Sequence, residues 1–291
     1  MDATGHVEQG RGHEAPPARA GSRPGDAAFT SAIAELYDRH LAPMIFEPYA
    51  LDLAGRVAAL DPTRVLEIAA GTGVATRALT QVLPARVELV ATDLNPAMLE
   101  RAAAVGTPRP VRWQQADAAH LPFEDAGFDV VACQFGAMFF PDKVQAFSEA
   151  RRVLRRGGAL VFSVWDRLEE NEFTETAMAA LARLFPRDPP RFMARTPHGY
   201  FDQAAISRDL AGAGFVVAPR FETVAKRSHA ESAQVTAFAL CHGTPLRSEI
   251  EARAGAGLAE ATSVCAAALA SRFGEGPIDG WIQAHVVTVR A

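Results

Sequence analysis

RVLEIAAGTGV, residues 64–74 of this 291-residue chain, is the stretch that decides the fold. It begins as an apolar run typical of a buried strand and ends in a glycine turn that opens a helix. Gly71 and Gly73 permit tight backbone geometry and the close approach of a ligand. The free N–H groups at the start of the helix face that ligand. The stretch therefore predicts a nucleotide site at the carboxyl end of a parallel strand.

Short apolar runs alternate with helical stretches from this unit onward. Strands are predicted at Arg64–Ala69, Val87–Thr92, Val111–Gln115, Phe128–Gln134 and Gly158–Trp165, and helices at Val74–Leu83, Pro96–Ala104 and Pro141–Arg155. Asn95-Pro96 supplies an N-cap and a first-turn proline for the second of these helices. Several strands are almost continuously apolar, as expected where helices cover both faces of a sheet. The alternation predicts a doubly wound α/β sheet.

The regular alternation stops after Trp165. Helices are predicted at Phe173–Phe185, Gln203–Ala213, 231–241 and 246–272, and strand material at Phe215–Val217, Phe221–Ala225 and Trp281–Arg290. Residues 167–202 also contain the loops PRDPPRF and TPHGYF. We interpret residues 167–202 as a substrate cap.

The N-terminal region is predicted to contain a tail and two helices. Residues 1–26 are rich in glycine and proline and bury too little apolar area to offset the entropy of ordering, so we expect a disordered tail. Residues 27–291 are expected to form one folded domain. One helix runs from Asp26, with an apolar face formed by Phe29, Ile33, Leu36, Tyr37 and Leu41. The other follows Pro48, with a stripe of Leu51, Ala54, Val57 and Ala58.

Composition excludes several classes of protein. The chain has 29 Lys and Arg against 34 Asp and Glu, so its net charge is −5 and no basic excess indicates a nucleic-acid partner. It contains no apolar run long enough to cross a membrane. Cys133, Cys241 and Cys265 are widely spaced, which argues against a disulfide framework and a metal cluster. They fit a reducing compartment, and without a secretory signal pattern we expect a cytoplasmic protein.

Four arginines, Arg151, Arg152, Arg155 and Arg156, precede Gly157-Gly158. They have two interpretations, a phosphate site or the basic end of a helix that complements its dipole. The second interpretation is the ordinary one for such a cluster.

Acidic residues stand at the ends of three successive predicted strands. Glu67 ends the first, Asp93 follows the second and Asp117 follows the third. A carboxylate after the second strand can accept hydrogen bonds from both ribose hydroxyls, and one after the third can accept from an adenine amine. Each acid alone can equally be a loop residue or a helix cap. Together with the glycine turn they favour a nucleotide site.

The glycine pattern argues against a dinucleotide. That motif requires G-x-G-x-x-G, and the third position here is Thr76. Glu67 before the turn and Asp117 one strand later are also foreign to the dinucleotide pattern. A nicotinamide-dependent oxidoreductase remains as an alternative function.

At these residues the chain resembles the class I S-adenosylmethionine-dependent methyltransferases, especially those of ubiquinone and menaquinone biosynthesis. The segments that carry the resemblance are YDRHLAP (37–43), VLEIAAGTG (65–73), TDLNPAML (92–99), QADAAHLPFEDAGFDVVACQ (115–134) and ARRVLRRGGALVFSVW (150–165). The resemblance implies a Rossmann-like, seven-stranded, mostly parallel sheet with helices on both faces, an N-terminal helical lid and a cap after strand five. It implies methyl transfer from S-adenosylmethionine to a small-molecule acceptor. Ala69 departs from the family, which has glycine at that position.

The resemblance also assigns the cofactor site. Ala69, Gly71 and Gly73 would line the methionine end, with Glu67 helping to hold the loop and Tyr37 closing over that end. Gln134 and Phe135 would border the methyl group. Asp93 would bind the ribose, Leu94 and Met98 would flank the adenine, and Asp117 and Ala118 would meet its amine. Core packing is the alternative role for Met98 and Phe135. A protein that binds the cofactor without transferring methyl is a further alternative.

Catalytic residues and the acceptor atom are left open by the sequence. A general base is needed only for an acceptor with an ionisable proton, and the candidates by residue type are His40, His198, His229, His242 and His285. His198 lies in the expected cap, although loop histidines are commonly exposed. Apolar residues of the cap would suit an apolar or aromatic acceptor, or simply form a helix core: Phe173, Leu181, Leu184, Phe185, Phe192, Met193, Tyr200 and Phe201.

Overall fold

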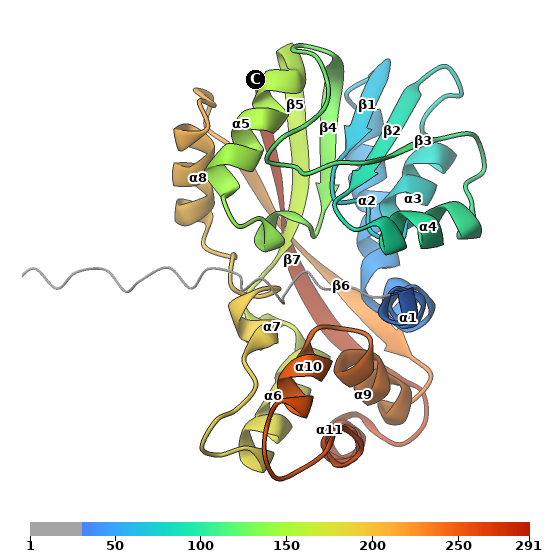
Figure 1. Cartoon of the computed structure of the whole chain (residues 1–291), viewed down its shortest axis with the longest axis vertical. Helices are drawn as coiled ribbons and strands as arrows, with labels where there is room; N and C mark the ends of the chain where they lie inside the picture. Colours follow the sequence, from blue (N-terminus) through green and yellow to red (C-terminus); the bar gives the residue numbers. More distant parts are fainter. Residues whose placement is uncertain (1–30) are drawn as a thin grey trace, which may run out of the picture.

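Seven strands form one sheet in the computed structural model, which describes residues 31–291 (Figure 1). They are β1 (Arg64–Glu67), β2 (Glu88–Asp93), β3 (Arg112–Gln115), β4 (Phe128–Gln134), β5 (Leu154–Trp165), β6 (Arg220–Ala230) and β7 (Ile278–Arg290). The order is β3-β2-β1-β4-β5-β7-β6, and β7 runs antiparallel to both of its neighbours. The predicted seven-stranded, mostly parallel sheet is therefore confirmed. The predicted disordered tail, residues 1–26, lies outside the described residues.

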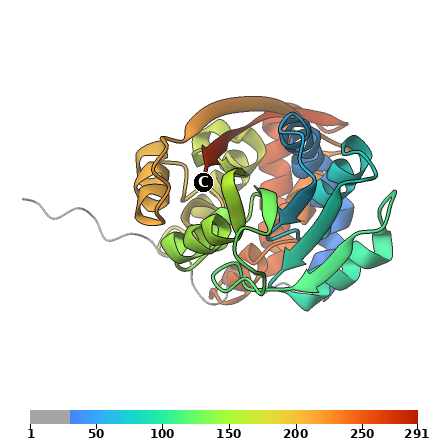
Figure 2. The ribbon, with the colours of Figure 1, turned by 90° about the horizontal axis from the view of Figure 1, so that it is seen from above.

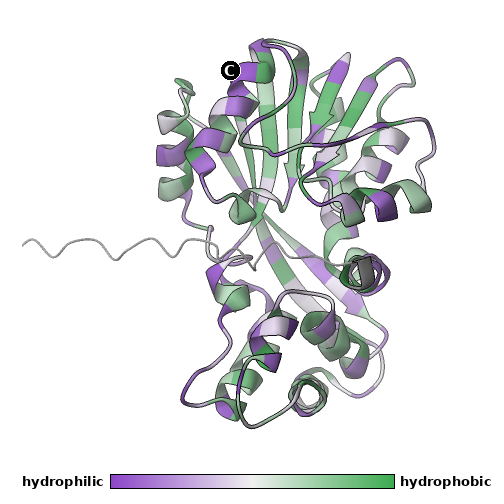
Figure 3. Cartoon of the chain, in the orientation of Figure 1, coloured by the Kyte–Doolittle hydropathy of each residue, from purple (hydrophilic) through white to green (hydrophobic). Residues whose placement is uncertain are grey.

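Helices cover both faces of the sheet (Figure 2). One face carries α2 (Glu47–Ala58), α3 (Val74–Val82) and α4 (Pro96–Val105), and the other carries α5 (Lys143–Val153) and α8 (Gln203–Gly212). The strands between them are largely hydrophobic (Figure 3), and residues 158–165 of β5 are all buried. Across residues 31–291, no helix has the length and apolar composition needed to cross a bilayer.

Local sequence signals explain where helices begin. The side chain of Asn95 accepts a hydrogen bond from the Ala97 N–H at 2.9 Å, which confirms the predicted start of α4. Asp142 does the same for α5 by accepting from the Gln145 N–H at 2.9 Å. By contrast, α3 follows Gly73, and no side chain caps its first N–H groups. These groups are available to a ligand at the carboxyl edge of the sheet.

The first predicted helix is divided in the structure. α1 (Ser31–Leu36) continues directly into a π-helix, η2 (Tyr37–Phe46), and α2 begins at Glu47. Pro43 lies inside η2. Proline has no backbone N–H and cannot continue the regular i→i−4 bonding of an α-helix, so its position inside η2 is consistent with the interruption of the α-helix there. The predicted start of this helix at Asp26, and with it Phe29, lies outside the described residues.

The predicted stripe of α2 is partly wrong. Leu51 is 59% exposed, whereas Ala54 and Val57 are buried as expected. The stripe instead begins at Tyr49, which is 1% exposed, and continues through Leu53. The large Tyr49 ring takes the inward face, and Leu51 lies two residues further around the helix, pointing away.

β7 joins the sheet to a second group of helices. Its residues 284–290 pair with β5, whereas residues 278–283 run past the end of β5 and pair with β6. Five helices gather around this extension (Figure 1): α6 (Glu172–Leu184), α7 (Phe192–Arg195), α9 (Ala233–His242), α10 (Leu246–Glu251) and α11 (Leu258–Phe273). Because α9, α10 and α11 lie between β6 and β7 in the chain, this helical lobe contains a second segment besides residues 167–202.

Two predicted elements in this half of the chain are wrong. The single helix expected at 246–272 is interrupted between α10 and α11, where Gly255 adopts a φ of +109° that a helix cannot contain. Residues 215–217 form no strand, and Val216 is 90% exposed. Short apolar runs of this kind do not reveal whether a neighbouring strand is available to pair with them.

The four arginines are also distributed differently from the prediction. α5 ends at Val153, so Arg155 and Arg156 lie in β5 rather than at the end of a helix. Arg152 binds the carboxylates of Glu149 and Asp125 at 2.7 and 2.8 Å, and Arg155 binds Asp129 at 2.5 Å. Two of the four guanidinium groups are thus paired with carboxylates of this chain, and the cluster is divided between a helix and a strand.

Tyr49 fixes α2 to the place where β7 leaves β5. Its hydroxyl lies 2.9 Å from the Ile282 carbonyl oxygen on β7 and 3.0 Å from the Val224 carbonyl oxygen on β6. The single hydroxyl hydrogen therefore serves two strands at the junction between the sheet and the helical lobe.

Tyr49→Phe should lower the free energy of unfolding by about 1 kcal/mol, because it removes this donor and leaves two carbonyl groups short of a partner. Urea unfolding followed by circular dichroism measures the change. Unchanged stability would show that the hydroxyl does not hold the junction.

Candidate functional site

A cavity of about 440 Å³ opens at the carboxyl ends of β1, β2, β3 and β4. Eleven of the twelve residues that the sequence assigns to a cofactor line it: Tyr37, Glu67, Ala69, Gly71, Asp93, Leu94, Met98, Asp117, Ala118, Gln134 and Phe135. They come from η2, the ends of three strands and the segments that follow four strands. The parallel register places these ends at one edge of the sheet.

The two glycines of the turn have different surroundings. Gly71 has a φ of +57°, and a Cβ added to it would meet no atom within 4 Å. A Cβ at Gly73, whose φ is +82°, would lie 3.0 Å from the Trp113 ring and 3.1 Å from the Ala102 Cβ. Gly73 does not line the cavity. The absence of a side chain at residue 73 is required by the packing of Trp113 and Ala102 against it, whereas at Gly71 it leaves open space beside the loop.

Asp93 holds the glycine turn in place. One carboxylate oxygen accepts a hydrogen bond from the Gly71 N–H at 2.8 Å, and the other accepts from the Asn95 N–H at 2.8 Å. Burial raises the pKa of Asp93 above its ordinary value, and these hydrogen bonds oppose the shift. A carboxylate has about four acceptor positions, so both oxygens keep capacity for ribose hydroxyls.

Glu67 is a fully buried carboxyl group at the end of β1. It is 1% exposed, and the Thr76 hydroxyl donates to it at 2.6 Å. Burial is the main cause that raises its pKa from 4.5 to about 8; the Asp93 charge adds to this shift, and the Thr76 hydrogen bond opposes it. The residue that breaks the dinucleotide pattern, Thr76, is therefore the direct partner of Glu67.

Ala69 adopts a backbone conformation that normally favours glycine, with a φ of +53°. Its extra methyl group fits because residue 136 is glycine. A Cβ on Gly136 would overlap the Ala69 Cβ and lie 2.9 Å from the Cys133 sulfur. The absence of a side chain at position 136 therefore leaves the space that the Ala69 methyl group occupies.

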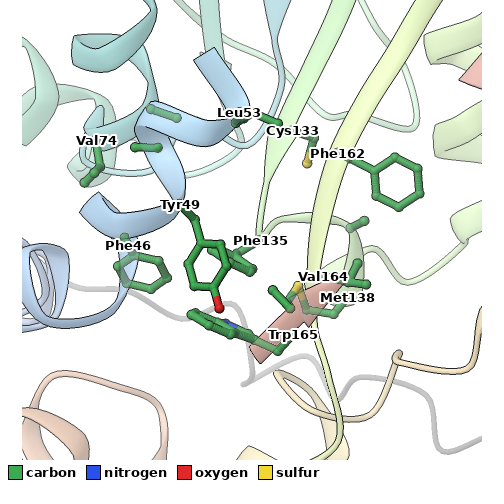
Figure 4. Close-up of a cluster of buried hydrophobic side chains, with 14 of the residues drawn as sticks. Phe46, Tyr49, Leu53, Val74, Cys133, Phe135, Met138, Phe162, Val164 and Trp165 are labelled. Carbon is green, nitrogen blue, oxygen red and sulfur yellow. The ribbon is translucent and has the colours of Figure 1, made fainter. Parts of the chain in front are cut away.

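Aromatic rings form the wall beyond the methionine end. The Phe135 ring stacks on Trp165 with centroids 3.8 Å apart and planes 4° apart, and Tyr49 meets both rings edge-on (Figure 4). Phe135 has a φ of +53°, which is strained for a bulky residue. The stacked Trp165 and neighbouring Phe46 hold it there. Phe135 is thus both core and cavity wall.

The opposite end of the cavity combines an apolar surface with one acid. Leu94 is 56% exposed and Met98 is buried, and both line the cavity. The Asp117 side chain is half-exposed, and its carboxylate accepts from the Ala119 N–H at 2.9 Å. A flat base with an exocyclic amine fits this combination.

Unsatisfied polar atoms mark the methionine end. Gln134 and Thr72 line the cavity, and the Gln134 Oε1 and the Thr72 hydroxyl are buried without a partner among the described residues. The Gln134 amide nitrogen donates to the Phe46 carbonyl at 3.1 Å. Because buried polar groups are normally hydrogen-bonded, these atoms fit a ligand with polar groups at this end. The chemistry of the residues that line the cavity therefore fits S-adenosylmethionine.

η2 covers this end of the cavity. Tyr37 stacks on Phe46 with ring centroids 4.8 Å apart, and burial raises the pKa of the Tyr37 phenol. The next residue, Asp38, forms ion pairs with Arg77 on α3 at 3.3 Å and with Arg101 on α4 at 2.9 Å. These ion pairs fasten η2 to two helices of the sheet.

A second, smaller cavity of about 60 Å³ adjoins the first. Tyr37, Phe46, Phe135 and Phe139 line both cavities. The remaining walls of the second cavity come from the helical lobe, η2, β5 and β7: Leu41, Ile45, Trp165, Asn171, Thr174, Phe192, Met193, Pro197, His198, Leu240, Thr244, Pro245 and Ile282. Of the acceptor-side candidates from the sequence, Phe192, Met193 and His198 line this cavity, whereas Phe173, Leu181, Leu184, Phe185, Tyr200 and Phe201 line neither cavity.

Of the five candidate histidines, His198 alone lines either cavity. It is 5% exposed, so the structure does not support an exposed loop histidine. His285 is buried between Asp166 and Thr223. His40 and His242 pack on the Phe238 ring, and His229 is an exposed partner of Asp279.

Comparisons with known proteins identify the class. The family described as "Methyltransferase domain" matches residues 66–162. The demethylmenaquinone methyltransferase of Deinococcus radiodurans is 41% identical over 110 residues, which cover 37% of this chain and 45% of that enzyme. The enzyme of the same name from Mycolicibacterium paratuberculosis is 34% identical over 161 residues, covering 52% and 67%. The match to the first of these relatives thus spans less than half of its length.

A solved structure shows the same fold. The YcgJ protein from Bacillus subtilis superposes with a TM-score of 0.53 at 20% identity, covering 83% of this chain and 97% of that one. Fold and sequence together define a class I methyltransferase. The chain belongs to the S-adenosylmethionine-dependent methyltransferase family that includes the demethylmenaquinone methyltransferases. The resemblance inferred from the sequence is confirmed, and the nicotinamide-dependent alternative is wrong.

Glu67→Gln should change how the stability of the cofactor-free protein depends on pH. Folding raises the pKa of Glu67 from 4.5 to about 8. Between these two pH values the Glu67 carboxyl group is therefore protonated in the folded state and ionised in the unfolded state. The contribution of Glu67 to stability is fully present below about pH 4.5 and is lost as the pH rises through about 8. Glutamine has no such loss. The thermal midpoint of the variant should therefore rise relative to wild type as the pH is raised across this window.

The exposed Glu100→Gln is the matched control and should show no such trend. An equal midpoint difference at both ends of the pH window would contradict the raised pKa.

Gly136→Ala should destabilise the protein by about 1–3 kcal/mol, because the new methyl group overlaps Ala69. Ala69→Gly in the same chain should recover part of this loss by removing both the overlap and the left-handed alanine. A double-mutant cycle of unfolding free energies measures the coupling. Additive effects of the two changes would rule out the compensation.

Proposed function

We propose that this protein transfers the methyl group of S-adenosylmethionine to a small, apolar, ring-containing acceptor bound in the second cavity. The observation that carries the proposal is the shared wall: Phe46, Phe135 and Phe139 line both the cofactor cavity and the cavity beyond it. Two ligands in these cavities would meet at these rings. Relatives named as demethylmenaquinone methyltransferases support an apolar ring compound as acceptor.

The residues present would hold the cofactor in one orientation. Asp93 would accept from the ribose hydroxyls, and Leu94 and Met98 would enclose the adenine. Gln134 and Thr72 would bind the amino-acid end, where their polar atoms lack partners. When bound, the cofactor supplies a methyl group on positively charged sulfur.

The aromatic wall would contribute to catalysis through position and environment. Faces of aromatic rings attract a cation, so Phe46 and Phe135 would favour the sulfonium at the junction of the cavities. The buried rings would also exclude water, and alignment of two bound reactants can be worth about 7–11 kcal/mol. No side chain has to form a bond with the methyl group.

Incubation with methyl-labelled S-adenosylmethionine and a panel of apolar aromatic compounds tests the proposal. We expect label in a compound that carries a ring and no charge. Binding of the cofactor without transfer to any compound, in the panel or in a metabolite extract, would favour a protein that binds the cofactor without methylating.

Thr174→Phe should reduce methyl transfer by about tenfold or more, because Thr174 lines the second cavity and a phenyl group would fill much of it. Cofactor affinity, measured by isothermal titration, should stay within about twofold, since Thr174 does not line the first cavity. A tenfold change corresponds to about 1.4 kcal/mol.

Val216→Phe adds the same group at a position that is 90% exposed and serves as the control. Normal transfer in the Thr174→Phe variant would place the acceptor elsewhere.

A further inference from the structure

We propose that His198 is the general base of the methyl transfer and that its Nε2 takes a proton from a hydroxyl group of the acceptor. The inference rests on the proposed function, because it requires an acceptor in the second cavity. It adds a catalytic residue and a chemical requirement: the acceptor must carry an ionisable hydroxyl.

The first observation is the position of His198 in the second cavity. The residue follows α7 in the chain, and its ring lies 6.1 Å from that of Trp165, which stacks on Phe135. His198 and Trp165 both line the second cavity, and Phe135 lines both cavities. The histidine therefore lines the second cavity but not the first, next to the ring stack that bounds the cofactor cavity.

The second observation is the hydrogen bond that fixes the tautomer. The His198 Nδ1 lies 2.8 Å from the backbone carbonyl oxygen of Asp166. A carbonyl oxygen can only accept, so Nδ1 carries the hydrogen. In the neutral ring, Nε2 then holds a lone pair and can accept a proton.

The third observation is the support for that carbonyl group. The Asp166 N–H donates to the Gln283 carbonyl at 3.0 Å, and the Gln283 amide donates to the Asp166 carboxylate at 2.7 Å. His285 lies 3.3 Å from the same carboxylate. Both side chains of the Asp166–His285 pair are 7% exposed. The carbonyl that orients His198 thus belongs to a fixed, buried residue that also links β5 to β7.

The environment keeps the base unprotonated. Burial lowers the pKa of His198 to about 4, whereas the Asp166 hydrogen bond and the charges of Glu169 and Asp166 oppose the shift. The ring is therefore neutral at neutral pH, as a proton acceptor must be. Once the ring accepts a proton, the Asp166 backbone carbonyl that accepts from Nδ1 and the negative charges of Glu169 and Asp166 favour the resulting positive charge.

The cavity lining selects the acceptor. None of the described residues that line the second cavity is Asp, Glu, Lys or Arg, so neither a cationic nor an anionic acceptor has a partner there. The Thr244 hydroxyl is committed to the Leu240 carbonyl and the Leu246 N–H. The Asn171 amide is committed to backbone groups. Tyr37, Thr174 and Trp165 also bring polar groups to this cavity, but among its lining side chains only His198 has a nitrogen that can take a proton.

The step balances without any further reactant. His198 Nε2 forms a bond to the hydroxyl proton as the O–H bond breaks. The electron pair released to the acceptor forms the new bond to the methyl carbon, and the pair of the broken S–CH₃ bond stays on sulfur. One positive charge passes from the sulfonium to the imidazolium, which returns its proton to water after the product leaves.

Two substitutions at His198 test the role. His198→Asn keeps a donor for the Asp166 carbonyl but has no basic nitrogen, and His198→Phe removes both nitrogens. We expect the turnover number to fall by about 100-fold or more in both variants, the range in which general bases contribute. Cofactor affinity should stay within about twofold, because His198 does not line the first cavity. His229→Asn, at an exposed histidine, should leave turnover unchanged.

A binding measurement separates this inference from the proposed function. With S-adenosylhomocysteine present, the wild-type protein should bind para-nitrophenol about tenfold more tightly than nitrobenzene, which lacks the hydroxyl. The preference should fall to within about twofold in His198→Phe.

Methyl transfer by a wild-type protein that binds the two probes alike, or binds neither, would overturn the role of His198 and leave the proposed function intact. Normal turnover in His198→Asn would overturn it as well. The absence of methyl transfer to any compound would instead count against the proposed function.

Discussion

The hydrogen bond between the Gly71 N–H and the Asp93 carboxylate is the contact on which the site depends. It ties the turn after β1 to the end of β2, and Thr76 ties the start of α3 to Glu67 on β1. Two buried carboxyl groups therefore shape the loop before any ligand arrives. Burial raises the pKa of both groups, and the Asp93 charge raises the pKa of Glu67 further. At neutral pH the buried Glu67 is therefore largely protonated in the folded protein.

The sheet and the cofactor cavity follow from local patterns in the sequence. Alternating apolar runs place β1–β5, and the positions of Glu67, Asp93 and Asp117 at strand ends bring them together through the parallel register. Other features depend on contacts that no local pattern encodes. The sequence pattern predicts that Gly73 contacts a ligand, whereas in the structure the Trp113 ring packs against it. The tolerance for Ala69 depends on Gly136, which is 67 residues away and belongs to another strand end.

The lining of the second cavity could not be predicted from the sequence either, because it too depends on contacts between residues far apart in the chain. Its walls come from η2, the segment after β4, β5, α6, α7 and the loop after it, α9 and the loop after it, and β7. These residues are separated by up to 245 positions, between Tyr37 and Ile282. Periodicity finds the buried face of each helix, but it does not say which faces meet. Burial of His198 likewise follows from the packing of its loop against β5, since nothing in TPHGYF distinguishes an inward ring from an exposed one. Tertiary packing therefore determines which residues line the second cavity, whereas the positions of the strand ends determine most of the lining of the first cavity.

The place of β7 in the sheet has a consequence for how the chain matures. β7 follows every other described strand in the sequence, yet it lies between β5 and β6, and β6 has no other strand neighbour. During synthesis, β1–β5 and their helices can assemble as they emerge, while β6 waits unpaired until residues 278–290 have left the ribosome. Until then the edge of β5 that later pairs with β7 is open and β6 has no strand partner, and unpaired strand edges are the surfaces most prone to pair with other chains. The arrival of β7 thus completes the sheet and brings in the strand around which the helical lobe packs.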